Sequence, residues 1–453
     1  MPQMKTKAEE QKTLDIARIQ KHVRLASFKG SPIYLAPSGF WQPLSESFFR
    51  RLAYTHLSVP SRTRVNEAWD YVLYGTVDLT KYAQYIRMGT LVWDTVAVDF
   101  TTEISIEDCV YATPVTPVTN PEPSEFILAL AKGSEGVYED ILQTIAPIFL
   151  KHKPAGVIWW KGNGSNGKTS LAQVLYDLFP NFIANLTIKQ IEDERDAPVL
   201  NGMLANVVKE SSDGYIQDSK AYKSIGTHED FPVHKFHSQE SISIDGSLHH
   251  IFSANNIPTF GDKSDGAKRR TLLIPFDARF SDDPTFIERT FTPGFYTQHL
   301  GLFLQYAKKL KEQGYHYQFS ARSTQVKDKY DVGTNSTATY LEELFAQNIF
   351  GFDNYGTLYM DYENWCIDNG YAVLGRQHLR RATEDSDFHA TTVRNDDGSH
   401  TKRYVHGEFT FKDLGYIGGF RPGLYRQLGA TTPIIERIPA KSNLQELLDA
   451  IPN

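Results

Sequence analysis

The chain has 453 residues, which exceeds the size of one ordinary domain and predicts two or three. Hydrophobic residues make up 41% of the sequence and aromatic residues 13%, so a largely disordered chain is excluded. The formal charge of -7 argues against a protein that coats nucleic acid with its whole surface, although a local basic stripe can still bind DNA.

The two cysteines and the hydropathy pattern favour a cytoplasmic protein. Cys109 and Cys366 are far apart in sequence, and two cysteines alone make neither a disulfide framework nor a zinc site. The polar segment from Met1 to Gly30 does not have the apolar run of a signal peptide, and no stretch is long enough to cross a bilayer. We therefore expect no membrane partner.

The first 120 residues predict an N-terminal accessory domain of mixed strands and helices. Its clearest strand-like run is Gly89–Phe100, which is apolar, β-branched and bounded by a glycine. A stretch rich in Pro and Thr, from Thr113 to Pro123, predicts a domain boundary. Apolar residues then recur at helical spacing within residues 121–152, which predicts a helical segment there.

Residues 153–325 predict an α/β core with a parallel sheet. Short apolar runs alternate with stretches of helical periodicity, and a long helical segment, Phe295–Lys311, closes the unit. The expected strands are Gly156–Trp160, Ala205–Val208, Leu248–Ser253 and Thr271–Pro275.

Residues 338–415 predict a small C-terminal domain with the pattern of a winged helix. Helical segments come first, and the turn Asn395–Gly398 then joins two strand-like runs. Residues 416–453 follow as a C-terminal tail. The predicted fold class is therefore α/β, with a flanking domain on each side of the core.

The segment from Gly162 to Thr169 has the spacing of a phosphate-binding loop, between a strand-like run and a helical run. Its glycines allow backbone N–H groups to turn toward phosphate oxygens, and the positive end of the next helix faces the same anion. Lys168 is expected to reach the β and γ phosphates of ATP, and Thr169 to hold Mg²⁺. The cofactor-binding candidates are Gly162, Asn163, Gly164, Ser165, Asn166, Gly167, Lys168, Thr169 and Ser170.

Polar residues after later strands are candidates to complete a hydrolytic site. Glu210 follows a short apolar run, where a P-loop ATPase places an acid that holds Mg²⁺ and orients the attacking water. Asn255 follows another such run and could lie near the γ-phosphate, although Asn-Asn before Pro is also an ordinary turn. Arg269 and Arg270 precede a strand, either as solvated surface or as an arginine finger for a neighbouring subunit.

Taken in order, these elements resemble those of the superfamily 3 helicases, and more narrowly the phage/plasmid primase-helicase family. The resemblance covers residues 90–415. It departs from related ATPases in the second motif, where Glu210 is a single acid preceded by Lys209. The matching segments are the loop with its Asn-Gly-Lys-Thr ending, Val207–Glu210, Tyr222–Gly226, Asn255–Pro258, Arg269–Arg270, Ile274–Phe276, Tyr362–Cys366, Asn369–Tyr371 and Leu374–Arg376.

The resemblance implies an AAA+ core that assembles into a homo-hexameric ring, with residues 121–152 as collar helices. It implies that Asn255 is a sensor and that Arg270 or Arg269 is the finger. It also implies catalytic roles for Lys168 and Glu210. A primase or another replication protein would be a further partner, in the cytoplasm of a bacterial host.

The resemblance also implies a DNA-contacting hairpin between the second acid and the sensor strand, near Val233–His237. Lys235 and His237 are the candidates for contact with single-stranded DNA, and a solvated charged turn is the alternative.

The predicted C-terminal domain carries a second set of basic residues. Arg376 and Arg380 share a helix face, Arg381 is adjacent, and Lys402 and Arg403 lie on the expected wing, where they would contact phosphates of double-stranded DNA. Because residues 368–412 contain seven acids and seven Lys or Arg residues, protein contact is an equal alternative.

Two classes of function remain open from the sequence, and a third possibility, an origin-binding initiator whose helicase activity is secondary, can coexist with the first. The first is an ATP-dependent replicative helicase of a phage, plasmid or genomic island that moves on single-stranded DNA. The second is a P-loop switch, or a packaging or segregation protein, that binds ATP and DNA without unwinding. The hairpin and the Arg269–Arg270 pair favour the first, because a switch needs neither.

Overall fold

The computed structural model forms two compact units, residues 1–326 and residues 327–453. Among the described residues no helix is both long and apolar enough to span a membrane. The described residues are 7–193, 195–211, 215–216, 220–234, 241–260, 266–333, 336–369, 371, 373–394, 397–417 and 421–430.

A five-stranded sheet forms the centre of the first unit, and its strand order is β16-β8-β14-β10-β9. Every neighbouring pair is parallel, so all five strands end at the same edge. The four predicted strands are confirmed, and the fifth, β9, has only two residues. The strands are β8 (Val157–Lys161), β9 (Ile183–Ala184), β10 (Ala205–Val208), β14 (His249–Ala254) and β16 (Thr271–Pro275).

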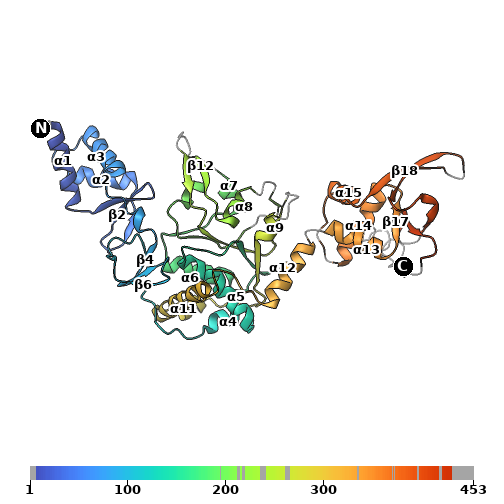
Figure 1. The fold of residues 1–453 in the computed structure, drawn as a ribbon. Helices are drawn as coiled ribbons and strands as arrows, with labels where there is room; N and C mark the ends of the chain where they lie inside the picture. Colours follow the sequence, from blue (N-terminus) through green and yellow to red (C-terminus); the bar gives the residue numbers. More distant parts are fainter. Residues whose placement is uncertain are drawn as a thin grey trace, which may run out of the picture. The chain divides into compact units, whose positions relative to one another are not determined.

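The middle strands read as continuous apolar runs because helices cover both faces of the sheet. Figure 1 shows α5 and α6 on one side and α7 and α8 on the other. Trp160 of β8 and Leu171 of α6 belong to the same buried core as Ile141 of α5 and Phe303 of α11. The helices are α4 (Glu125–Leu130), α5 (Glu135–Ile145), α6 (Lys168–Leu178), α7 (Ile188–Glu192), α8 (Lys220–Thr227), α9 (Gly266–Arg270), α10 (Phe286–Thr290) and α11 (Pro293–Glu312), with 3₁₀ helices η2 (Ala146–Phe149) and η3 (Ala197–Leu200).

The N-terminal part of this unit has two small sheets and three helices. The run Gly89–Phe100, expected as one strand, is wrong as a single element. It turns after Asp94, whose Oδ1 accepts from the N–H groups of Val96 at 2.7 Å and Ala97 at 3.2 Å. The elements are α1 (Lys7–Gln20), β1 (Leu25–Phe28), β2 (Ser31–Leu35), β3 (Trp41–Pro43), α2 (Glu46–His56), α3 (Arg62–Tyr74), η1 (Thr80–Tyr82), β4 (Tyr85–Met88), β5 (Leu91–Asp94), β6 (Asp99–Thr101) and β7 (Tyr111–Thr113).

An antiparallel hairpin stands between β10 and β14, where one was expected. It consists of β12 (Phe231–His234) and β13 (Ser241–Ile244), with Val233 opposite Ile242. Lys235 and His237, the predicted contacts with single-stranded DNA, lie outside the described residues. A separate short pair joins β11 (Tyr215–Ile216) and β15 (Thr259–Phe260) in parallel.

The second unit has the element order α13-β17-α14-α15-β18-β19, followed by β20 and β21. Its sheet is antiparallel, in the order β18-β19-β17-β21-β20, and Trp365 and Leu379 lie in its buried core. The elements are α13 (Ser336–Ala346), β17 (Ile349–Phe352), α14 (Tyr355–Asn369), α15 (Arg376–Asp385), β18 (Phe388–Arg394), β19 (His400–His406), η4 (Phe411–Asp413), β20 (Leu414–Tyr416) and β21 (Leu424–Gln427); α12 (Ala321–Gly333) runs across the division between the units.

Candidate functional site

The predicted nucleotide-site residues gather at the carboxyl edge of the parallel sheet. The loop after β8 lies beside the end of β14, because Ala254 pairs with Lys161 in the sheet. Asn255 therefore follows β14 next to this loop, and Glu210 lies shortly after the end of β10 on the other side of β14. Ligands of α/β proteins bind at this edge, in the crevice outside the carboxyl ends of the strands.

The loop has a tight conformation that requires glycine at three positions. Gly164 and Gly167 have φ values of 88° and 79°, in the left-handed region that favours glycine. A Cβ added at Gly162 would lie 2.0 Å from Nδ2 of Asn166 and 2.6 Å from the carbonyl oxygen of Phe276. The loop is also held from outside, since Ser165 accepts a hydrogen bond from the N–H of Phe280 at 2.7 Å.

The backbone N–H groups of residues 163–170 have no acceptor among the described residues. They surround the N-terminus of α6, an 11-residue helix whose first amides point out of the helix with its positive dipole end. The first N–H groups of a helix have no intrahelical acceptor, and Asn163, Gly164, Ser165 and Thr169 are exposed, so this row of amides is open to an anion or to solvent. Amides arranged in this way suit the oxygens of a phosphate group.

Lys168 connects the loop to Asn255. Its ammonium donates to the carbonyl oxygen of Gly162 at 2.7 Å, to Oδ1 of Asn166 at 3.0 Å and to Oδ1 of Asn255 at 3.4 Å. Burial lowers the pKa of Lys168 to about 8, against the opposing effect of the Glu210 carboxylate, which favours the charged form. A buried cation with only neutral protein acceptors gains most from a negatively charged ligand.

Thr169 and Glu210 are both exposed at this edge. The N–H of Ser211 donates to the carbonyl of Ser253 at 2.7 Å, which fixes the chain after Glu210 against β14. Lys209 turns away, because its ammonium donates to Oε1 of Gln173 at 2.7 Å.

The described residues contain no group of three or more acidic, His or Cys side chains that could hold a metal. A hydroxyl and one carboxylate fit Mg²⁺, which usually takes one or two protein ligands and completes its shell with phosphate and water.

The two candidate finger arginines differ in their surroundings. Arg269 is exposed, whereas Arg270 is half-buried and donates from Nη1 to the carbonyl of Gly266 at 2.7 Å. The stem of Arg270 packs on Gly226 of α8, where an added Cβ would lie 2.8 Å from Cδ of the arginine. Arg270 is therefore held against α8 and α9, whereas Arg269 is exposed.

The segment Tyr222–Gly226 has a structural role that the sequence did not indicate. The buried hydroxyl of Tyr222 accepts from Nε1 of Trp159 at 2.9 Å and shares a hydrogen bond with Oγ1 of Thr271 at 2.7 Å. The carbonyl of Gly226 accepts from the N–H of Gly156 at 3.0 Å. Helix α8 is thereby fixed to β8 and β16, and it supports the base of α9, which carries both arginines.

The basic residues of α15 lie on its exposed face, while Leu379 and Thr383 are buried beneath it. Arg376 and Arg380 lie over tyrosine rings, with Cζ 5.2 Å from the centroid of Tyr359 and 5.6 Å from that of Tyr355. Arg380 also pairs with Glu384 in the next turn, at 2.9 Å. Arg381 is exposed.

Lys402 and Arg403 point to opposite faces of β19, because neighbouring strand residues alternate. Lys402 is exposed. Arg403 is engaged inside the unit: its Nε lies 3.0 Å from Oδ1 of Asp353, and its Cζ lies 5.2 Å from the centroid of Phe411. The predicted phosphate contact of Arg403 therefore competes with an internal ion pair.

Comparison with known proteins gave matches among solved structures alone. No family model and no curated protein matches the chain. The apo structure of the NrS-1 C-terminal region gives a TM-score of 0.48 at 12% identity, over 89% of this chain and 100% of that one. Two A-form apo structures of the same region give TM-scores of 0.46 and 0.45 at 11% and 12% identity, each over 87% of this chain and over 98% and 99% of theirs.

Proposed function

We propose that this protein is an ATP-driven DNA helicase of superfamily 3, which works as a hexameric ring on single-stranded DNA in DNA replication. The observation that carries the proposal is the row of unpaired amides at residues 163–170, beside a buried lysine that also contacts Asn255. The strand order and the P-loop position support an AAA+ core, and α13-β17-α14-α15-β18-β19 supports a winged helix.

In this proposal the amides of the loop and Lys168 hold the phosphates of ATP. Thr169 and Glu210 would hold Mg²⁺, which neutralises charge on the phosphates when it is bound. Glu210 also orients the attacking water, and the amide of Asn255 positions the γ-phosphate relative to it. Arg269 reaches the γ-phosphate bound by a neighbouring subunit, where a guanidinium stabilises the charge of the transition state.

The hairpin β12–β13 is the proposed contact with DNA in the ring. It connects to β14, whose last residue precedes Asn255, and this strand is the proposed link between the nucleotide and the hairpin. Helix α15 and the β18–β19 hairpin would bind double-stranded DNA.

The test is the substitution Lys168→Ala, with Lys189→Ala as control, since Lys189 is an exposed lysine of α7. Lys168→Ala should abolish both ATP hydrolysis and strand displacement on 5′-tailed and 3′-tailed substrates, while Lys189→Ala should leave both unchanged. Unwinding that survives Lys168→Ala would exclude the proposed motor. A wild-type monomer that hydrolyses ATP without unwinding, and without response to single-stranded DNA, would favour the switch or packaging function instead.

A further inference from the structure

A second polar pocket lies at the opposite edge of the parallel sheet, and the proposed helicase cycle does not use it. The pocket encloses about 300 Å³, and its lining includes Lys29, Lys81, Lys151 and Lys153. Lys151 and Lys153 precede β8, and Asp245 precedes β14, so these residues lie at the amino ends of the strands. The loop at Gly162 lies at the carboxyl ends, and the two sites are therefore distinct.

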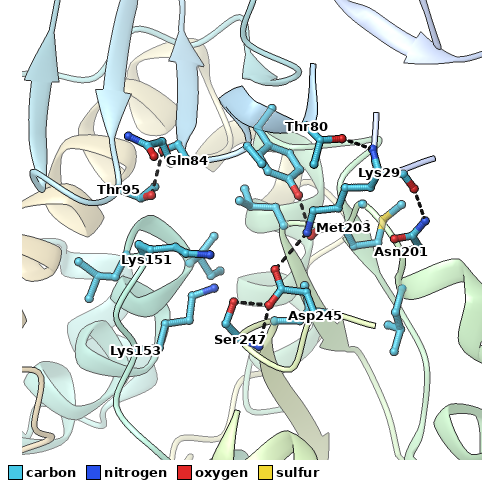
Figure 2. A pocket seen from close by; sticks show the side chains of 18 of the residues that line it. Lys29, Thr80, Gln84, Thr95, Lys151, Lys153, Asn201, Met203, Asp245 and Ser247 are labelled. Carbon is cyan, nitrogen blue, oxygen red and sulfur yellow. Dashed lines mark hydrogen bonds and ion pairs between the residues drawn. The ribbon is translucent and has the colours of Figure 1, made fainter. Parts of the chain in front are cut away.

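The lysines of this pocket outnumber its acids. Lys29 is paired, with its ammonium 3.1 Å from Oδ2 of Asp245, and Asp245 also accepts from the hydroxyl of Ser247 at 2.5 Å. Figure 2 shows the ends of Lys151 and Lys153 facing the same space as Asp245. Within the described residues neither of these two ammonium groups has a hydrogen-bond acceptor or an acid of its own.

The charged groups of this pocket influence one another's pKa values. Burial, together with the smaller effects of the Lys151 and Lys29 charges, lowers the pKa of Lys153 to about 8 against the opposing effect of Asp245. Burial alone would raise the pKa of Asp245, but Lys29 and the hydrogen bonds from Ser247 outweigh it and hold this pKa below its usual value. Like charges that line one pocket repel one another, and a bound anion relieves that repulsion.

The rest of the lining suits a small ligand. Ile148, Leu150 and Leu248 supply apolar wall, and the hydroxyl of Tyr111 donates to the carbonyl of Met203 at 3.2 Å, which holds the back of the pocket in place. A neighbouring cavity of about 370 Å³ shares Lys29 and Asp245 and is bordered by Ser243 in the hairpin strand β13. Ligand pockets combine apolar walls with a few convergent polar groups in this way.

We propose that Lys151 and Lys153, with Lys29, bind the phosphate groups of a small oligophosphate such as pyrophosphate or the triphosphate of a nucleotide. A volume of about 300 Å³ is enough for a ligand of this size and too small for a folded partner. Lysine ammonium groups are compact charges with three donors each, which suits the several oxygens of linked phosphates. A strand of nucleic acid carries the same phosphate chemistry, and the experiment separates the two sources. The proposal does not depend on helicase activity.

The test uses pyridoxal 5′-phosphate on the full-length protein at pH 7.5. Its phosphate occupies the site, its aldehyde forms an imine with an unprotonated lysine, and borohydride fixes the product for peptide mapping. Lys153 should be labelled at least about tenfold faster than Lys189, because a lower pKa leaves more free amine. Labelling at Lys168 is mapped on a different peptide and reports the loop site separately.

Competition identifies the ligand. Pyrophosphate should protect Lys153, and Lys151→Met should weaken that protection roughly tenfold, because one charge-assisted contact is lost. Lys189→Met is the matched control and should change nothing. Lys151 is exposed, so its replacement does not threaten folding. Protection by a short oligothymidylate but not by pyrophosphate would assign the phosphate to a nucleic-acid strand. Labelling of Lys153 that is no faster than that of Lys189, or that neither competitor reduces, would overturn the proposal.

Discussion

Nζ of Lys168 lies 3.4 Å from Oδ1 of Asn255, although 87 residues separate them in the sequence. The contact exists because β8 and β14 are adjacent parallel strands, which end at the same edge of the sheet. Asn255 has an exposed side chain that extends to the loop, whereas the residue before it, Ala254, is buried. The arrangement places this amide beside the lysine, where in the proposed function it also faces the γ-phosphate.

Asn255→Ala should slow ATP hydrolysis by roughly 10- to 100-fold and change ATP affinity by less than about tenfold, because an amide that positions the γ-phosphate acts mainly in the transition state. Steady-state hydrolysis and equilibrium binding of a fluorescent nucleotide measure the two effects. Asn256→Ala is the matched control, as Asn256 is the exposed neighbour and should tolerate the change. Equal losses in both variants would mean that the loop was merely disturbed.

ATP binding should depend on pH through Lys168. Its pKa is about 8 in the free protein, and bound phosphate would raise it. Protonation therefore favours the complex: binding takes up a proton when the pH exceeds 8, and affinity falls as the pH rises further. Calorimetry at pH 9 in two buffers of different ionisation enthalpy should detect this uptake, and at pH 7 it should be small. Lys168→Arg keeps the charge at both pH values and should remove the uptake. Undiminished uptake in Lys168→Arg would assign it to another group.

The sheet strands could be predicted because strands covered on both faces are largely apolar, as in Val157–Lys161 and Thr271–Pro275. The order of the strands could not be, since it depends on pairings between distant segments. Strand β9 was missed because Ile183–Ala184 is too short to carry a pattern. The turn inside Gly89–Phe100 depends on hydrogen bonds to one carboxylate, which an apolar pattern does not reveal.

Part of the candidate site could also be predicted from the sequence, and part could not. The loop from Gly162 to Thr169 could be read from spacing, because the chemistry requires contiguous residues. The difference between Arg269 and Arg270 depends on Gly226 of another helix and needs the fold. The lysine pocket was not predicted at all: Lys29 and Asp245 are 216 residues apart, and no local pattern marks either of them.

The two arginines of α9 should respond differently to replacement. Arg269→Ala should reduce ATP hydrolysis by roughly a thousandfold in the assembled ring, as expected for a finger, with melting temperature and nucleotide affinity unchanged. Arg270→Ala should lower the melting temperature by a few degrees, because it removes packing on Gly226 and the hydrogen bond to Gly266.

Rings assembled from two kinds of variant subunit provide the control for the proposed arginine finger. Arg269→Ala subunits retain their own loop, so mixed rings with Lys168→Ala subunits should recover hydrolysis at those interfaces where an intact loop meets an intact arginine. If Arg270→Ala abolished hydrolysis without a loss of stability, and Arg269→Ala had no effect, the roles assigned to the two residues would be reversed.

The basic residues of the second unit should also separate into two groups. Arg380→Ala with Arg381→Ala should weaken binding of double-stranded DNA about tenfold. It should also reduce the dependence of affinity on salt, because binding releases fewer counterions when phosphate contacts are lost. ATP hydrolysis should not change. Arg403→Ala should instead lower the stability of the unit, because Arg403 holds Asp353 and lies against Phe411. DNA binding by fluorescence anisotropy at several salt concentrations, beside thermal melting, distinguishes the groups. Unchanged affinity and salt dependence in the double variant would leave α15 as a surface for protein contact.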